Sequence, residues 1–126
     1  MKKIFNGTPH SINIIDPSSV VFDEKNRKYV SANPIIVKTI MSDGLLNARL
    51  EKRTGEKING EISTVTTKVV TVDNLPDGYD YYIVSALYLG AAKACGKDTG
   101  KFLTIGDPVY SVDGLKPMGT LTLQRN

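Results

Sequence analysis

The chain has 126 residues, and its 40% hydrophobic and 23% charged residues are typical of one compact soluble domain, which we expect to span residues 1–126. No apolar run approaches the roughly 20 residues that a membrane span requires. Polar Asn6 and Gly7 follow the first residues too soon for a signal peptide, so we expect neither export nor a membrane partner.

The first half of the chain predicts short strands separated by turns. Alternating side chains or short apolar runs beside turn residues mark four segments: 11–14, 20–22, 28–30 and 34–40. Residues 45–53 are ambiguous between a strand and one or two helical turns, and we favour the strand. Residues 61–72 are dense in β-branched side chains, which fit a pleated surface, and predict the clearest strand of the chain.

One principal helix is expected in the second half. After a turn at residues 73–78, an apolar strand at residues 81–84 leads into an alanine- and leucine-rich segment at residues 85–95. Ser85 is placed to cap the first helical turn, and Gly96 is placed to end the helix. The stripe expected to face the sheet consists of Leu89, Ala92 and Cys95.

The last segments predict a hairpin and complete the fold. Residues 107–112 and 118–124 flank a turn at residues 113–117 that contains an Asp-Gly pair. With the preceding elements this predicts an α+β fold, a mainly antiparallel β-sheet with one principal helix after a buried strand. A small β-rich chain has sheet edges to cover, so we consider a homo-oligomer.

The cysteine and histidine counts limit the chemistry of the chain. Cys95 has no partner for an internal disulfide, and its apolar neighbours are typical of a packed thiol rather than a reactive one. A single histidine and a single cysteine cannot form a structural zinc site, and the carboxylates lack the spacing of a calcium loop. We therefore expect neither a metal nor a cofactor.

The net charge of +3 originates in the first half of the chain. Residues 1–60 hold ten Lys or Arg against six Asp or Glu. Several of these basic side chains gather near an expected turn: Arg49, Lys52, Arg53 and Lys57. They could attract an anion, but Glu51 and Glu56 intervene, and no aromatic residue interleaves as base stacking requires. We favour a solvated hairpin tip, keep an anion-binding patch as the alternative, and do not expect nucleic acid as a partner.

The only histidine lies in a proline-stiffened bend, residues 6–10. His10 could act as a general base or donate to a phosphate or carbonyl of a ligand, which makes it the candidate catalytic residue. The alternative is a structural histidine that caps the strand or packs on the sheet edge. Three polar side chains are expected to group around it: Asn6, Thr8 and Asn13. Ser85 would join them if residues 81–84 pair beside residues 11–15.

Two tempting motifs fail on their spacing. A Walker loop needs four residues between its glycines and Ser or Thr after its lysine, whereas residues 96–102 have three and then Phe102. Lys97 and Lys101 of this loop stay candidates for contact with an anionic ligand. Ser85 lacks the flanking glycines of a nucleophile elbow, so we interpret it as a helix cap.

Three parts of the chain resemble a family of small proteins found in phage genomes and bacterial chromosomes. Its members open with a TPH-x-I-N-I stretch, carry LP…YIVS-x-L past the middle, and close with a hairpin. The matching parts here are residues 6–14, Leu75-Pro76 with residues 82–87, and residues 109–119. Residues 18–60 carry no match, and residues 96–101 replace an Arg-containing loop of the family. The resemblance implies a phage protein that acts in the host cytoplasm.

Three functions from different classes fit these observations. The first, which we favour, is an accessory protein that acts by binding, for example an anti-defence protein that sequesters a nucleotide-derived signal or blocks a host defence protein. The second is a small hydrolase that uses His10 on a phosphodiester or ADP-ribose-like bond, although a second catalytic histidine is missing. The third is a structural or assembly protein of the virion. Because no catalytic constellation is complete, we expect binding rather than catalysis.

Overall fold

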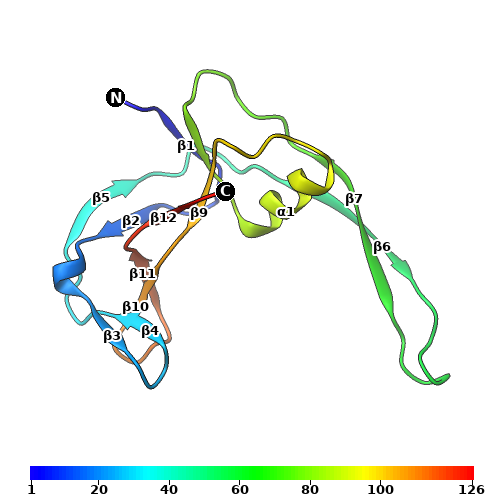
Figure 1. Ribbon diagram of the computed structural model, residues 1–126, viewed down its shortest axis with the longest axis horizontal. Helices are drawn as coiled ribbons and strands as arrows, with labels where there is room; N and C mark the ends of the chain where they lie inside the picture. Colours follow the sequence, from blue (N-terminus) through cyan, green and yellow to red (C-terminus); the bar gives the residue numbers. More distant parts are fainter.

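A computed structural model describes all 126 residues and confirms the α+β class, with one α-helix and twelve strands. The strands form a four-stranded sheet, a six-stranded sheet and a two-stranded ribbon. In Figure 1 the two sheets lie at the left and centre, and the ribbon projects away from them to the right. No helix of the structure is both long and apolar enough to span a membrane.

The only α-helix of the protein connects two strands of the four-stranded sheet. Its strands are, in order, β1 (Ile4–Asn6), β8 (Tyr81–Ile83), β9 (Phe102–Ile105) and β12 (Leu123–Arg125). The first three strands run parallel, and β12 runs antiparallel to β9. Helix α1 (Ala86–Ala94) connects β8 to β9, as a parallel pair requires. Five of the nine strand pairs in the protein are antiparallel, as predicted, and four are parallel.

The six-stranded sheet is assembled from three antiparallel pairs, which join one another in parallel. Its order is β3 (Val21–Asp23), β4 (Lys28–Val30), β10 (Pro108–Tyr110), β11 (Pro117–Thr120), β2 (Ile12–Ile15) and β5 (Ile36–Ile40). The predicted strands in these regions and the turn of the C-terminal hairpin are confirmed. The strand predicted at residues 118–124 is divided, however, because β11 ends at Thr120 and residues 123–125 form β12 of the four-stranded sheet. A short 3₁₀ turn, η1 (Pro17–Ser19), follows β2 and is capped by the Asp16 side chain. Strand β5 forms one edge of this sheet.

The two-stranded ribbon, which we call the arm, comprises residues 48–72. Strand β6 (Ala48–Thr54) pairs antiparallel with β7 (Val65–Val72), and residues 55–64 form its tip. The strand that we favoured at residues 45–53 is confirmed in its second half. Residues 61–64, which we assigned to the next strand, belong instead to the tip, where Gly55 bonds back to Thr64.

The main core lies between α1, the four-stranded sheet and the base of the arm. Its buried cluster consists of Leu46, Val72, Tyr82, Val84, Tyr88, Ala91, Ala92 and Phe102. The Tyr88 ring packs 5.8 Å from that of Phe102, and its hydroxyl donates to the Asp73 carbonyl at 2.6 Å. Burial, with a smaller effect of the Asp73 charge, raises the pKa of Tyr88 above its ordinary value. Tyr88 thereby fixes how α1 is rotated about its axis.

This rotation corrects the predicted contact stripe. The helix and its cap are confirmed, because the Ser85 side chain accepts from the Tyr88 N–H at 3.1 Å and Gly96 adopts a positive φ of 72°. The buried helix residues are Tyr88, Ala91 and Ala92. Cys95 is exposed, so the prediction of a packed thiol was wrong. It stands at the C-cap, past the last helical residue, where the chain already turns away from the sheet.

Candidate functional site

The N-terminal bend is organised by the buried side chain of Asn6. Its Nδ2 group donates to the carbonyl oxygens of His10 at 3.0 Å and Ile40 at 3.1 Å. Its Oδ1 accepts from the Thr8 backbone N–H at 3.1 Å and from the Thr8 hydroxyl at 2.7 Å. Since Asn6 is 0% exposed and each of its polar atoms has two partners, its side chain holds the bend together and offers nothing to a ligand. We therefore withdraw Asn6 as a ligand-binding residue.

The remaining bend residues differ in how free they are. The single Thr8 hydroxyl proton is shared between Asn6 Oδ1, at 2.7 Å, and the His10 carbonyl, at 3.1 Å, so Thr8 belongs to the same network as Asn6. His10 is exposed, and its ring forms no hydrogen bond or ion pair within the protein. A ring without a carboxylate or hydroxyl partner lacks the orientation that a catalytic base needs. His10 as a ligand-binding or catalytic residue stays a prediction.

Asn13 faces a different surface from the bend. On strand β2, its Nδ2 group donates to the Met118 carbonyl of β11 at 3.4 Å, and its Oδ1 accepts from Thr39 of β5 at 2.8 Å. The side chain thus lies across three neighbouring strands of the six-stranded sheet. It stabilises that sheet, and the described contacts do not join it to His10.

Ser85 lies at the same end of the four-stranded sheet as the bend, because β8 pairs with β1. We did not predict this pairing. Residues 81–83 pair with β1 rather than with residues 11–15. Beyond this pairing, the Gly7 N–H donates to the Ile83 carbonyl at 2.8 Å. A Cβ added to Gly7 would lie 2.6 Å from the Leu46 side chain, so only glycine fits this close approach. Ser85 follows Ile83 by two residues. Its hydroxyl oxygen accepts from the Tyr88 N–H and thus caps α1.

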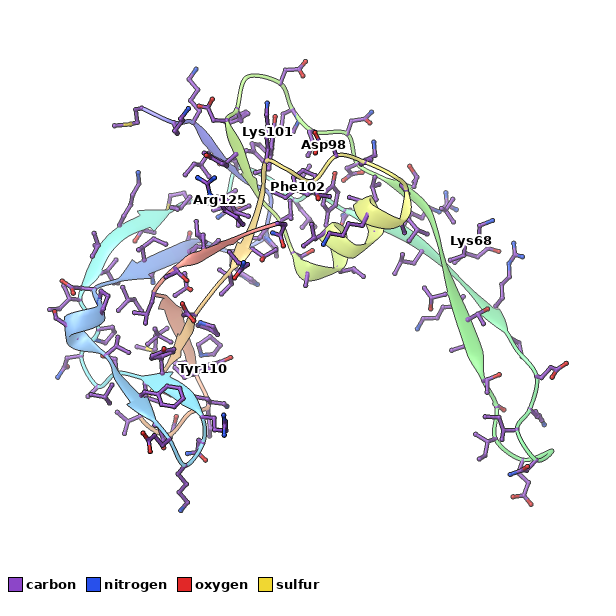
Figure 2. All side chains as sticks on the ribbon, viewed as in Figure 1. Lys68, Asp98, Lys101, Phe102, Tyr110 and Arg125 are labelled. Atoms are coloured by element: carbon purple, nitrogen blue, oxygen red, sulfur yellow. The ribbon has the colours of Figure 1, made fainter.

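Lys97 and Lys101 lie at the opposite end of the helix–sheet unit. The bend and Ser85 follow the carboxyl ends of parallel strands β1 and β8, whereas Lys101 precedes the amino end of β9 and Lys97 follows the C-terminus of α1. Figure 2 shows Lys101 beside Asp98 at the start of β9. Lys97 and Lys101 therefore do not share a site with His10, and their contact with an anionic ligand stays a prediction.

An unpredicted pocket lies where β3, β4 and β10 meet. It has a volume of about 300 Å³, and its lining residues are Phe22, Arg27, Lys28, Tyr29, Asp107, Pro108 and Tyr110. Phe22 and Tyr29 pack edge to face, with ring centroids 5.0 Å apart. The Tyr110 ring, labelled in Figure 2, lies 4.7 Å from the Lys28 ammonium group.

The polar groups of this pocket carry both signs of charge. The Lys28 ammonium is fixed by donation to the Gly114 carbonyl at 3.1 Å, whereas the Arg27 guanidinium is exposed and forms no ion pair. On the other wall, the Asp107 carboxylate accepts from Thr122 at 2.8 Å. Such a pocket could stack a planar ring, attract a phosphate through Arg27 and accept a hydrogen bond from a ligand hydroxyl through Asp107.

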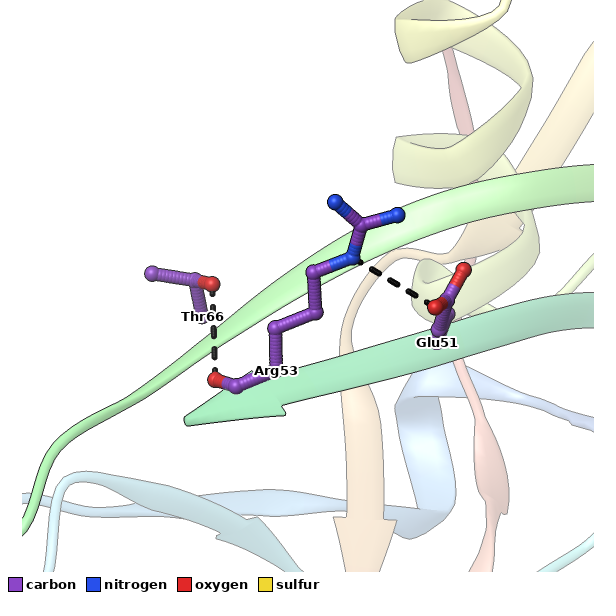
Figure 3. Close-up of polar contacts among 3 residues, drawn as sticks. All are labelled: Glu51, Arg53 and Thr66. Carbon is purple, nitrogen blue, oxygen red and sulfur yellow. Dashed lines mark hydrogen bonds and ion pairs between the residues drawn. The ribbon is translucent and has the colours of Figure 1, made fainter. Parts of the chain in front are cut away.

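The basic cluster of the arm is divided between two faces. Cross-strand register places Arg49, Arg53 and Lys68 on one face and Lys52 on the other, because neighbouring residues of a strand alternate. On the first face Glu51 stands 3.4 Å from the Arg53 Nε, in the one ion pair of the protein, and Thr66 donates to the Arg53 carbonyl (Figure 3). Both partners are exposed, so this pair adds little stability. The arrangement fits a solvated hairpin better than a single anion-binding patch.

No cluster of three or more potential metal-ligating side chains occurs in the structure. Comparisons with protein-family models, curated proteins and solved structures found no match to this chain. The functional argument therefore depends on the surfaces of the molecule itself.

Proposed function

We propose that the protein is a subunit of a homo-oligomeric assembly in which the arm binds neighbouring copies, as expected of a structural or assembly protein of a phage particle. The observation that carries this proposal is the accessible surface of 8657 Å² for a chain of 13.7 kDa. A compact monomer of this mass exposes about 6,600 Å². The excess of roughly 2,000 Å² is surface that a partner would cover.

The arm accounts for much of this exposed surface. From residue 51 to residue 68 no side chain is buried, and the large apolar residues exposed in this part of the arm are Ile58, Ile62 and Val65. An isolated two-stranded hairpin is marginally stable in water, because each strand has only one partner and no face is covered. Contact with a second chain would supply the missing partner.

Hydrogen exchange tests this proposal directly. In an assembly, the amides of residues 51–68 are expected to exchange slowly at high protein concentration and quickly after dilution. The amides of α1 serve as the internal control, because the core that protects them belongs to the same chain. Fast exchange along the outer arm at every concentration would contradict the proposal.

Ligand binding is the second candidate, and the pocket at β3, β4 and β10 favours it. Its three aromatic rings and free Arg27 suit a nucleotide, which combines a planar base with a phosphate. We therefore transfer the hypothesis of a sequestered nucleotide-derived signal from the His10 bend to this pocket. An anti-defence role and a hydrolytic role for His10 stay predictions.

Equilibrium dialysis against mononucleotides, cyclic nucleotides and ADP-ribose tests this second candidate. Loss of one stacking ring costs about 1–3 kcal/mol, so Phe22→Ala should weaken binding at least about fivefold. Val21→Ala, in the neighbouring exposed residue that lies outside this pocket, is the matched control. If the protein retains none of these nucleotides, the ligand hypothesis is wrong.

A further inference from the structure

We infer that strand β7 of one copy pairs with the open edge of strand β5 in a second copy and extends that copy's six-stranded sheet. This inference rests on the proposed assembly and identifies the two surfaces that meet. Both surfaces belong to the same chain, so a second copy of the protein can supply the partner of each.

Strand β5 has the features of an edge that requires cover. It pairs with β2 on one side only. Its exposed apolar side chains include Ile36 at 49% and Val37 at 66%, and its single charged residue is Lys38. At the end of the strand, the Ile40 carbonyl accepts a hydrogen bond from the Asn6 side chain. The preceding residues of the outer edge have no described partner. Exposed apolar edge strands are templates for pairing with another chain.

The composition of the arm selects β7 rather than β6 as the pairing strand. Charged side chains on an edge strand oppose pairing. Four of the seven residues of β6 are charged, whereas Lys68 is the only charged residue among the eight of β7. The other residues of β7 are valines and threonines, which favour strands. Val65 and Val70 are 66% and 48% exposed and can cover apolar side chains of a neighbour.

The two surfaces lie at opposite ends of the molecule. In Figure 1 β5 lies at the left and the arm reaches to the far right. Contact between them is therefore head-to-tail, which produces a ring if the rotation closes and a filament if it does not. Each copy then contributes two separate interfaces. At about 800 Å² per partner for a standard interface, two such surfaces match the excess of roughly 2,000 Å².

Disulfide formation between two variants tests the pairing. In a Cys95→Ser background, Val37→Cys on β5 is mixed with Thr66→Cys, Thr67→Cys or Lys68→Cys on β7, which covers alternative registers. Lys52→Cys is the matched control, because Lys52 stands opposite Thr67 on the other strand of the arm. Adjacent strands bring Cα atoms within disulfide range, whereas the next strand lies too far away. We expect a mixed dimer from Val37→Cys with at least one β7 variant and little from the control.

The outcomes separate the failure of this inference from the failure of the assembly. Disulfides formed only between two copies of one β7 variant would mean reciprocal pairing of arms and would overturn the inference. If the protein has an oligomeric mass but Val37→Cys forms no disulfide with any β7 variant, the strand pairing is overturned and the proposed assembly is not. A second variant, Val37→Asp, should abolish oligomers, whereas Leu115→Asp, at an apolar residue 80% exposed outside both surfaces, should not. A monomeric parent protein would overturn both proposals.

Discussion

Leu50 stands opposite Val69 in the arm, and Val69 is the outermost arm residue that packs against the core. Beyond this pair the arm leaves the body of the protein and none of its side chains is buried, whereas Val69 on the returning strand is half-buried. The pair therefore separates a base that belongs to the monomer from an outer segment whose contacts must come from elsewhere.

The close approach of Gly7 to its neighbours predicts a strong effect of one added methyl group. Gly7→Ala should destabilise the protein by about 1–3 kcal/mol, because the new Cβ would overlap the Leu46 side chain. Gly90→Ala is the control, since Gly90 lies in α1 with no atom within 4 Å of an added Cβ. That change should stabilise the protein by about 1 kcal/mol. Urea denaturation of both variants measures the difference, and equal effects would contradict the packing described for the bend.

The hydrogen bonds of Asn6 predict that the bend depends on this residue and not on His10. Asn6→Ala leaves buried groups without partners and should cost about 3 kcal/mol of stability. His10→Ala removes an exposed ring and should change stability by less than about 0.5 kcal/mol. Thermal unfolding of the two variants compares these effects. A large loss with His10→Ala would instead assign the histidine a structural role.

The raised pKa of Tyr88 predicts a loss of stability in alkaline solution. Folding holds the phenol in its neutral form, so the stabilisation is complete below the ordinary pKa near 10 and disappears as the pH rises through the higher folded value. Tyr88→Phe loses the hydrogen bond to Asp73, at a cost of about 1 kcal/mol, but also removes this titration. Denaturation between neutral pH and pH 11 should show a steeper decline for the parent protein. Parallel curves would refute the assignment.

The sequence predicted the elements whose formation is determined by residues adjacent in the chain. Ser85 and Gly96 identified both ends of the helix, and the Asp-Gly turn identified the C-terminal hairpin. The predicted helix stripe holds for Ala92 and Leu89 but fails at Cys95, and it missed Tyr88, whose hydroxyl bonds to Asp73 and sets the rotation of the helix. A spacing pattern of apolar residues contains no information about that contact.

The pairing of distant strands could not be predicted from the sequence. Strand β1 pairs with β8, almost eighty residues away. A three-residue strand has too few alternating polar and apolar residues to specify such a partner. The same limit concealed the aromatic pocket. Phe22 and Tyr29 flank a charged turn in the sequence, but Tyr110 joins them only because β10 pairs with β4.

The native mass of the protein, with and without the outer arm, tests the central claim most directly. Replacing residues 51–68 by Asn-Gly joins Leu50 to Val69 through a two-residue turn and keeps the base that packs on the core. Light scattering should give a mass several times 13.7 kDa for the parent protein and a monomer mass for the shortened variant, with matching circular dichroism of the core. A parent protein that is monomeric at every concentration, or a shortened variant that assembles equally well, would contradict the account.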